Sequence, residues 1–257
     1  MALVNLNADM GESFGRYRLG NDEALIKHVL SANIACGYHA ADPGTIHATV
    51  KLAKDHGVEI GAHVAYPDLA GFGRRKMGLS EQEVFEITVY QIGAVKAFCA
   101  AENVPLNHVK PHGELYLAAA VDPEVARGVV RALKAVDDSL LLFLVGPIVD
   151  AACRDLGIMM VNEGYVDLDY NPDGSLYLDK KREARDPAEV ARNAISLVEE
   201  GGRLALDGSS WIVLPTQTIC MHGDMANGIE LAKKTRKELQ NRGHRVVKSR
   251  LVALASL

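Results

Sequence analysis

Polar and ionisable residues recur directly after short apolar segments of this 257-residue chain. Aspartate, glutamate, histidine and lysine in such positions can transfer protons, bind a metal ion or stabilise an anion. Five segments carry them: 7–12, 33–39, 61–68, 108–113 and 217–224. They hold five of the nine histidines, which are His39, His63, His108, His112 and His222. One such histidine is usually a hydrogen-bonded core residue, but their convergence predicts a shared catalytic pocket.

The apolar segments read as strands that alternate with amphipathic helices. The expected strands are 3–7, 31–35, 59–63, 107–110, 140–145, 159–162 and 217–221. Helix starts are marked by an N-cap followed by proline at Asp42-Pro43, Asp122-Pro123 and Asp186-Pro187, and by a Ser80–Glu83 capping box. This alternation predicts a parallel sheet, and we expect a closed or distorted (β/α) TIM-like barrel with its active site at the carboxyl ends of the strands. An open doubly wound sheet is the alternative, although no GxGxxG follows the first strand.

Length and composition limit the possible domain organisation and the possible partners. We expect a single domain over residues 1–257, interrupted by an insertion at 163–185 whose turn signal Asn171-Pro172-Asp173-Gly174 predicts a hairpin or lid. The net charge of −5 disfavours nucleic-acid binding. The chain has no secretory signal pattern and no apolar run of about 18 residues, so we expect a cytoplasmic protein without a membrane span. Four scattered cysteines predict buried free thiols.

The residue types suggest roles for the catalytic candidates. Asp9 and Glu12 are candidates for a general base or for binding a cation. Asp9, His39 and His63 would suit a metal site of one carboxylate and two histidines, or they hold the loops together through hydrogen bonds. Lys110 and His112 are one strand alternation apart, so both can face an oxyanion or a phosphate.

A second set of residues is predicted to bind substrate or phosphate. Arg74 and Arg75 lie in a glycine-hinged loop and are candidates for a carboxylate or phosphate clamp. The further candidates at strand ends are Asn7, Asn33, Gln217, His222 and Asp224. Asp224 is also a candidate to orient His222, although residues this close together more often serve a turn. Cys36, near histidines at a strand end, is an alternative nucleophile for a Cys–His amidase or else a buried core thiol.

Seven motifs resemble those of the LamB/YcsF (lactam utilisation) family and occur in the same order. They are NLNADMGESFG, SANIACGYHAADPGT, IGAHVAYPDLAGFGRR, VYQIGA, HVKPHGELY, DGSL and QTICMHGD. The resemblance extends from Leu3 to about Leu239, and the characterised members of the family are A subunits of 5-oxoprolinase. It implies a distorted barrel related to polysaccharide deacetylases, ATP-dependent opening of 5-oxoproline to glutamate, and partner proteins of the B and C type.

The implied reaction gives the candidate residues tasks. Phosphorylation of the lactam oxygen would turn it into a leaving group, after which water needs a base such as Asp9 or a histidine. Lys110 and Arg75 would then stabilise negative charge. The sequence has no GxxxxGK[ST] loop, so ATP would bind in another way or with help from a partner.

Several positions depart from the family pattern. Leu168 and Asp179 stand where the family has arginines, and further differences are Val64, Ala65, Glu114, Leu117 and Met225. Lys180, Lys181 or Arg182 could replace one lost charge, but otherwise a carboxylate-bearing lactam should bind poorly and a neutral cyclic amide should be preferred. Two other functions stay open: a metal-dependent, deacetylase-like hydrolase without ATP, and a binding protein that has no catalytic activity.

Overall fold

The computed structural model describes residues 1–177 and 183–255. Its strands are β1 (Leu3–Met10), β2 (Ser31–Ala35), β3 (Glu59–Val64), β4 (Leu106–Pro111), β5 (Leu141–Leu144), β6 (Met160–Tyr165), β7 (Asp169–Tyr170), β8 (Leu176–Tyr177), β9 (Gly202–Leu204), β10 (Trp211–Val213), β11 (Thr218–His222) and β12 (Arg245–Val246). Its helices are α1 (Asp22–Leu25), η1 (Ile26–His28), α2 (Pro43–Asp55), α3 (Glu81–Ala101), α4 (Gly113–Val121), α5 (Pro123–Val136), α6 (Pro147–Leu156), α7 (Pro187–Glu199), α8 (Gly228–Asn241) and α9 (Ser249–Leu254).

The strands form a parallel barrel, as the sequence predicts. The sheet order is β11-β6-β5-β4-β3-β2-β1-β12, and β11 also pairs with β1, which closes the sheet. The α/β barrel prediction is therefore confirmed. Every expected barrel strand is present, but β1 continues to Met10, so Asp9 lies within the strand rather than in the loop after it.

The predicted helix starts are confirmed by their capping hydrogen bonds. Asp42 accepts from the backbone N–H of Thr45, and Asp122 and Asp186 cap α5 and α7 in the same way. Ser80 and Glu83 form the reciprocal capping box of α3. These caps satisfy backbone donors that the first helical turn leaves without partners.

The described residues group into two compact units that alternate along the chain. The first comprises Met1–Ala8, Gly20–Ser31 and Asn162–Leu257, and the second comprises Asp9–Leu19 and Ala32–Val161. We call them the terminal unit and the central unit. The single-domain organisation expected from the length stays a prediction.

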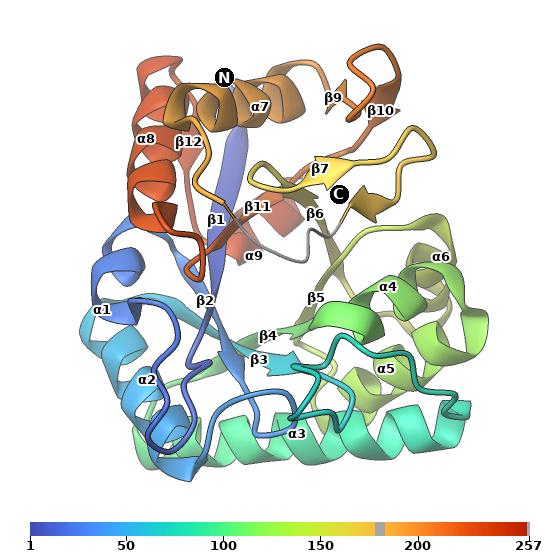
Figure 1. Ribbon diagram of the computed structural model, residues 1–257. Helices are drawn as coiled ribbons and strands as arrows, with labels where there is room; N and C mark the ends of the chain where they lie inside the picture. The colour runs from blue at the N-terminus through green and yellow to red at the C-terminus, as the bar shows by residue number, and fades with distance from the viewer. Residues whose placement is uncertain (178–182, 256–257) are drawn as a thin grey trace. The chain divides into compact units, whose positions relative to one another are not determined.

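In the central unit, helices α3 and α5 lie side by side, and α3 also packs on β3 (Figure 1). The apolar face of α3 buries Val84, Ile92 and Val95. Within the described part of the chain, α3 is also the one helix whose length and composition would suffice to cross a membrane. Because α3 packs against a strand and a helix, it has the features of a core helix.

In the terminal unit, α7 packs against α8 and β11 pairs in parallel with β6. The hairpin predicted in the insertion is present, because β7 and β8 pair antiparallel around the turn that contains Gly174. Asp169 at its base is paired with Arg185 at 2.7 Å and with Arg203 at 3.4 Å. These ion pairs connect the base of the hairpin to Arg185, where the insertion ends, and to Arg203 in β9, while the role of the insertion as a lid stays a prediction.

Candidate active site

The first part of the site is built around Asp9 in the central unit. Asp9 Oδ1 accepts hydrogen bonds from Lys110 Nζ at 2.9 Å and from Asn33 Nδ2 at 2.8 Å. Asp9 Oδ2 lies 3.3 Å from His63 Nε2. The parallel register of β3 and β4 places His63 opposite Lys110, so the strands themselves bring these groups together. The Lys110 ammonium is almost fully buried, and the Asp9 carboxylate compensates its charge.

His108 holds Asn33 in the orientation that serves Asp9. Its Nε2 lies 2.8 Å from Asn33 Oδ1, and its ring stacks on Phe143 at 4.0 Å. Burial lowers the pKa of His108 to about 3, so the ring is neutral and Nε2 carries its proton for this hydrogen bond. A Cβ at Gly61 would lie 2.1 Å from this ring, which explains the glycine in β3.

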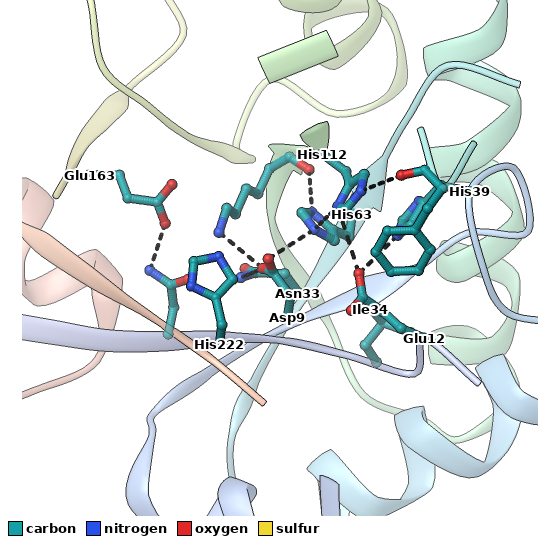
Figure 2. Close-up of polar contacts among 12 residues, drawn as sticks. Asp9, Glu12, Asn33, Ile34, His39, His63, His112, Glu163 and His222 are labelled. Carbon is teal, nitrogen blue, oxygen red and sulfur yellow. Dashed lines mark hydrogen bonds and ion pairs between the residues drawn. The ribbon is translucent and has the colours of Figure 1, made fainter. Parts of the chain in front are cut away.

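A second group, the histidine cluster, consists of Glu12, His39, His63 and His112 (Figure 2). The rings of His39 and His112 stack with centroids 3.8 Å apart, and His63 stands edge-on to both. Glu12 Oε1 lies 3.1 Å from His39 Nε2 and 3.6 Å from His112 Nδ1. Each member offers one ligand atom, and these atoms all lie within 4.8 Å of one another. The arrangement therefore suits a metal ion.

Two backbone carbonyls fix the orientation of the cluster. His63 Nδ1 lies 2.9 Å from the carbonyl oxygen of Lys110, and His112 Nε2 lies 2.9 Å from that of Phe72. Phe72 has φ of 54°, in the left-handed region that bulky residues rarely adopt. Gly73 follows with φ of 65°, and a Cβ there would meet His112 at 2.9 Å. The strained loop thus aims a carbonyl at His112 and leaves room for the ring.

Burial sets the charge of the cluster. It lowers the pKa of His39 and His112 well below the usual range, and the neighbouring histidines lower it further. Both rings are therefore neutral near pH 7 and keep a lone pair on one nitrogen. A neutral imidazole with a lone pair is the form that binds metals.

The terminal unit holds another buried polar group, and part of it was not predicted from the sequence. His222 Nδ1 lies 2.9 Å from Asp167 Oδ1, and the His222 backbone N–H donates to Asp167 Oδ2. The Tyr165 hydroxyl donates to Glu163, which also accepts from Asn7 Nδ2 at 2.9 Å. Asp167 is therefore a carboxylate bonded to the ring of His222, while the orienting role expected for Asp224 stays a prediction. The sequence assigned Glu163 and Asp167 to the polar insertion, where no periodic pattern singles them out, but β6 continues to Tyr165, so Glu163 lies in that strand and Asp167 follows it.

Gln217 and Asn7 are placed by contacts that hold strands together. Gln217 immediately precedes β11, whereas His222 ends that strand. Its side-chain oxygen accepts from the backbone N–H of Asn162 at 2.8 Å. Asn7 lies inside β1 and also donates to Thr218. The predicted substrate contacts of Gln217, Asn7 and Asp224, and a pocket that includes His222 with the central-unit residues, stay predictions.

The two loop arginines have different surroundings. Arg75 is hydrogen-bonded to the buried carboxylate of Asp68, which also accepts from the backbone N–H of Gly71. Arg74 is exposed, and its guanidinium lies 5.1 Å from the ring centroid of Phe72. It is also close enough to lower the pKa of His39. Arg74 is therefore the better placed of the two to meet a substrate anion.

Cys36 does not have the environment of an activated nucleophile. All four cysteines are buried free thiols, as expected. The Cys36 thiol donates to the backbone carbonyl of Ile34 at 3.2 Å, and burial strongly raises its pKa. A reactive cysteine needs a lowered pKa, so this environment favours the interpretation of Cys36 as a buried core thiol.

Comparison with known proteins agrees with the resemblance seen in the motifs. The profile of the LamB/YcsF family matches residues 4–253. The chain belongs to the LamB/YcsF family. The 5-oxoprolinase A subunit of Pyrococcus abyssi is 46% identical over 247 residues, which cover 95% of this chain and 96% of the relative. That of Bacillus licheniformis is 44% identical over 93% of this chain and 96% of the relative.

Solved structures extend the comparison to the fold. The lactam utilization protein of Thermus thermophilus is 43% identical and superposes with a TM-score of 0.87 over 96% of this chain and 99% of that protein. A putative cellobiose-phosphate cleavage protein of Enterococcus faecalis gives a TM-score of 0.56 at 11% identity over 98% of both chains. The second match shows a shared fold alone.

Proposed function

We propose that this family member hydrolyses the amide bond of a cyclic amide, 5-oxoproline or a related lactam, in a reaction coupled to ATP hydrolysis. The observation that carries the proposal is the buried Asp9–Lys110–Asn33 group beside His63. Family membership supports the reaction class, since relatives at 44–46% identity are named as the A subunit of 5-oxoprolinase.

The chemistry requires activation of both reactants. A lactam amide is a poor electrophile, and phosphorylation of its oxygen by ATP makes that oxygen a leaving group as phosphate. Water then attacks the former carbonyl carbon, the C–N bond breaks as the ring nitrogen takes up a proton, and an acyl phosphate remains. A second water molecule attacks this acyl phosphate, which releases phosphate and leaves the carboxylate. The net reaction consumes lactam, ATP and two water molecules and yields the open amino acid, ADP and phosphate.

The central unit supplies groups for the hydrolytic half. Asp9 acts as the general base that takes a proton from water, while Asn33 and Lys110 hold its carboxylate in place. Lys110, buried and positively charged, stabilises negative charge that develops on the substrate. His222, bonded to Asp167, serves as a proton carrier.

The names of the relatives support the proposal that this chain works together with partner proteins. The relatives are named as one lettered component of an enzyme, so we propose that the chain works with two further proteins, of the B and C type, one of which helps to bind ATP. Because the reaction uses ATP, we expect it to take place in the cytoplasm. The acidic net charge disfavours binding to nucleic acid, and a reaction on a small molecule requires no membrane, so we propose neither as a partner.

A second candidate is a metal-dependent hydrolase that needs no ATP, which the histidine cluster favours. One assay separates the two functions. The purified chain is incubated with 5-oxoproline and a panel of neutral lactams, with and without ATP and with and without B-type and C-type partners. Ring opening that requires ATP supports the first proposal. Ring opening without ATP that a chelator abolishes supports the second, and no ring opening under any condition contradicts both.

A further inference from the structure

Two buried imidazoles in the central unit face each other through nitrogens that can both be without a proton. His112 Nδ1 lies 3.0 Å from His63 Nε2 (Figure 2). A carbonyl oxygen only accepts hydrogen bonds, so His63 carries its proton on Nδ1, toward Lys110, and His112 carries its own on Nε2, toward Phe72. If both rings are neutral, the facing nitrogens present two lone pairs to each other.

Such a contact is unfavourable unless a cation lies between the two lone pairs. A proton shared by the rings would serve, and so would a metal ion. Two nitrogens bound at about 2.0–2.1 Å to one tetrahedral zinc ion lie roughly 3.3 Å apart, close to the spacing of this pair. The other ring nitrogens donate to backbone carbonyls, the arrangement that orients histidines bound to metals.

Glu12 and His39 complete the set on the same side. Glu12 Oε1 lies within 3.1 Å of His39 Nε2 and 3.6 Å of His112 Nδ1, so its carboxylate faces the nitrogens of two rings. The carboxylate of Glu12 belongs to the cluster and that of Asp9 lies beside it, so a divalent ion held there would be close to negative charge.

We propose that Glu12, His39, His63 and His112 bind one divalent transition-metal ion of the zinc class. The sequence suggested Asp9, His39 and His63 instead. In the structure, Asp9 is hydrogen-bonded to Lys110 and Asn33, and Glu12 and His112 lie with His39 and His63 in the cluster. Nitrogen and carboxylate ligands of this kind suit zinc, cobalt, nickel or iron better than magnesium or calcium.

The inference deepens the proposed function, on which its catalytic meaning rests. The His63 ring lies between the cluster and Asp9, whose Oδ2 is 3.3 Å from His63 Nε2. A water bound to the ion would be a fifth ligand beside the four side chains; in that position the ion can lower the pKa of the water, and Asp9 can accept a proton from it. Binding itself is independent of the substrate and is measured without any lactam.

The test is a titration of the metal-stripped full-length chain with zinc and, separately, with cobalt. We expect one ion per chain by calorimetry, a higher Tm with zinc, and visible absorption bands with cobalt. Glu12→Gln and His63→Asn should each weaken binding by at least about a hundredfold, since even residues that merely orient ligands contribute 10–100-fold. The control is His56→Ala, which removes an exposed histidine at the end of α2 and should bind as the unaltered chain does.

The outcomes decide between the metal and the shared proton. If the folded, unaltered chain binds neither ion, the proposal is overturned and a proton accounts for the His63–His112 contact. Equal binding by the unaltered chain and by folded Glu12→Gln and His63→Asn also overturns it, because the ion then lies elsewhere. Binding that fits the proposal in a chain without lactam hydrolysis would contradict the proposed function and leave the metal site standing.

Discussion

Buried histidines occur in two regions of this chain, and the partners of their rings differ. In the histidine cluster of the central unit, His63 and His112 each donate one ring N–H to a backbone carbonyl. In the terminal unit, the ring of His222 is bonded to the carboxylate of Asp167. A carbonyl fixes the tautomer and adds no charge, whereas a carboxylate stabilises the protonated ring.

The difference teaches that the partner of a histidine, and not its position at a strand end, decides its chemistry. Rings whose lone pairs converge on one point are suited to hold a cation. A ring held by a carboxylate is suited to gain and lose a proton. We therefore expect the two regions to have different chemical roles, and variants that remove these partners test this expectation.

The largest effect is expected at Asp9, beside the histidine cluster. Asp9→Asn removes the general base, and we expect kcat for lactam opening to fall by roughly 100- to 10,000-fold. The assay contains ATP and the partner proteins, and circular dichroism verifies the fold, because Lys110 loses its charged partner. Asp55→Asn, at the exposed end of α2, is the matched control. Full activity in a folded Asp9→Asn protein would remove Asp9 from the mechanism.

A smaller loss is expected when His222 loses its carboxylate. Asp167→Asn should lower kcat by up to about a hundredfold, the order of loss caused by misplacing a catalytic group by about 1 Å. Asp224→Asn is the comparison variant and should have the smaller effect. If Asp224→Asn caused the larger loss, His222 would not act through Asp167.

The sequence predicts strand ends well and side-chain partners poorly. Caps and apolar runs located the strands, and hence the edge where Asp9, His63 and Lys110 meet, because parallel strands share one carboxyl edge. The sequence did not reveal Asp167 as the partner of His222, because 55 positions separate the two residues. It also could not show that Phe72 aims its carbonyl at His112, since that depends on a left-handed backbone at a residue type that rarely adopts one.

The loop arginines give a prediction about the substrate. Arg74 is exposed near His39, whereas Arg75 is bonded to Asp68, so Arg74→Gln should raise KM for 5-oxoproline about tenfold, the loss of one charge-assisted hydrogen bond. KM for a neutral lactam should not change. Arg75→Gln is the paired variant, and we expect it to act mainly on the stability of the loop.

The same assay tests the expected preference for a neutral cyclic amide. Leu168 is buried, and its carbonyl accepts from Arg203, while Asp179 lies outside the described residues. A higher kcat/KM for neutral lactams than for 5-oxoproline would support the preference. The opposite ranking, together with a KM effect at Arg74, would show that Arg74 provides carboxylate recognition in place of the family arginines.

The smallest expected effect concerns the anchoring of the insertion. Asp169→Asn removes the carboxylate partner of Arg185 and of the buried Arg203. We expect the free energy of unfolding to fall by about 2 kcal/mol, or the Tm to fall by roughly 5 °C.

The two arginines hold the pKa of Asp169 below its usual range, Arg185 more strongly. The stabilisation is therefore complete above the ordinary aspartate pKa and is lost as the pH falls through the lowered one. The Tm difference between the two proteins should accordingly persist at neutral pH and vanish only in strong acid. Glu238→Gln, which removes an exposed ion pair with Lys234 in α8, is the control and should lower the Tm much less, because solvent screens exposed ion pairs. Equal Tm values for Asp169→Asn and Glu238→Gln at neutral pH would mean that these ion pairs do not hold the insertion in place.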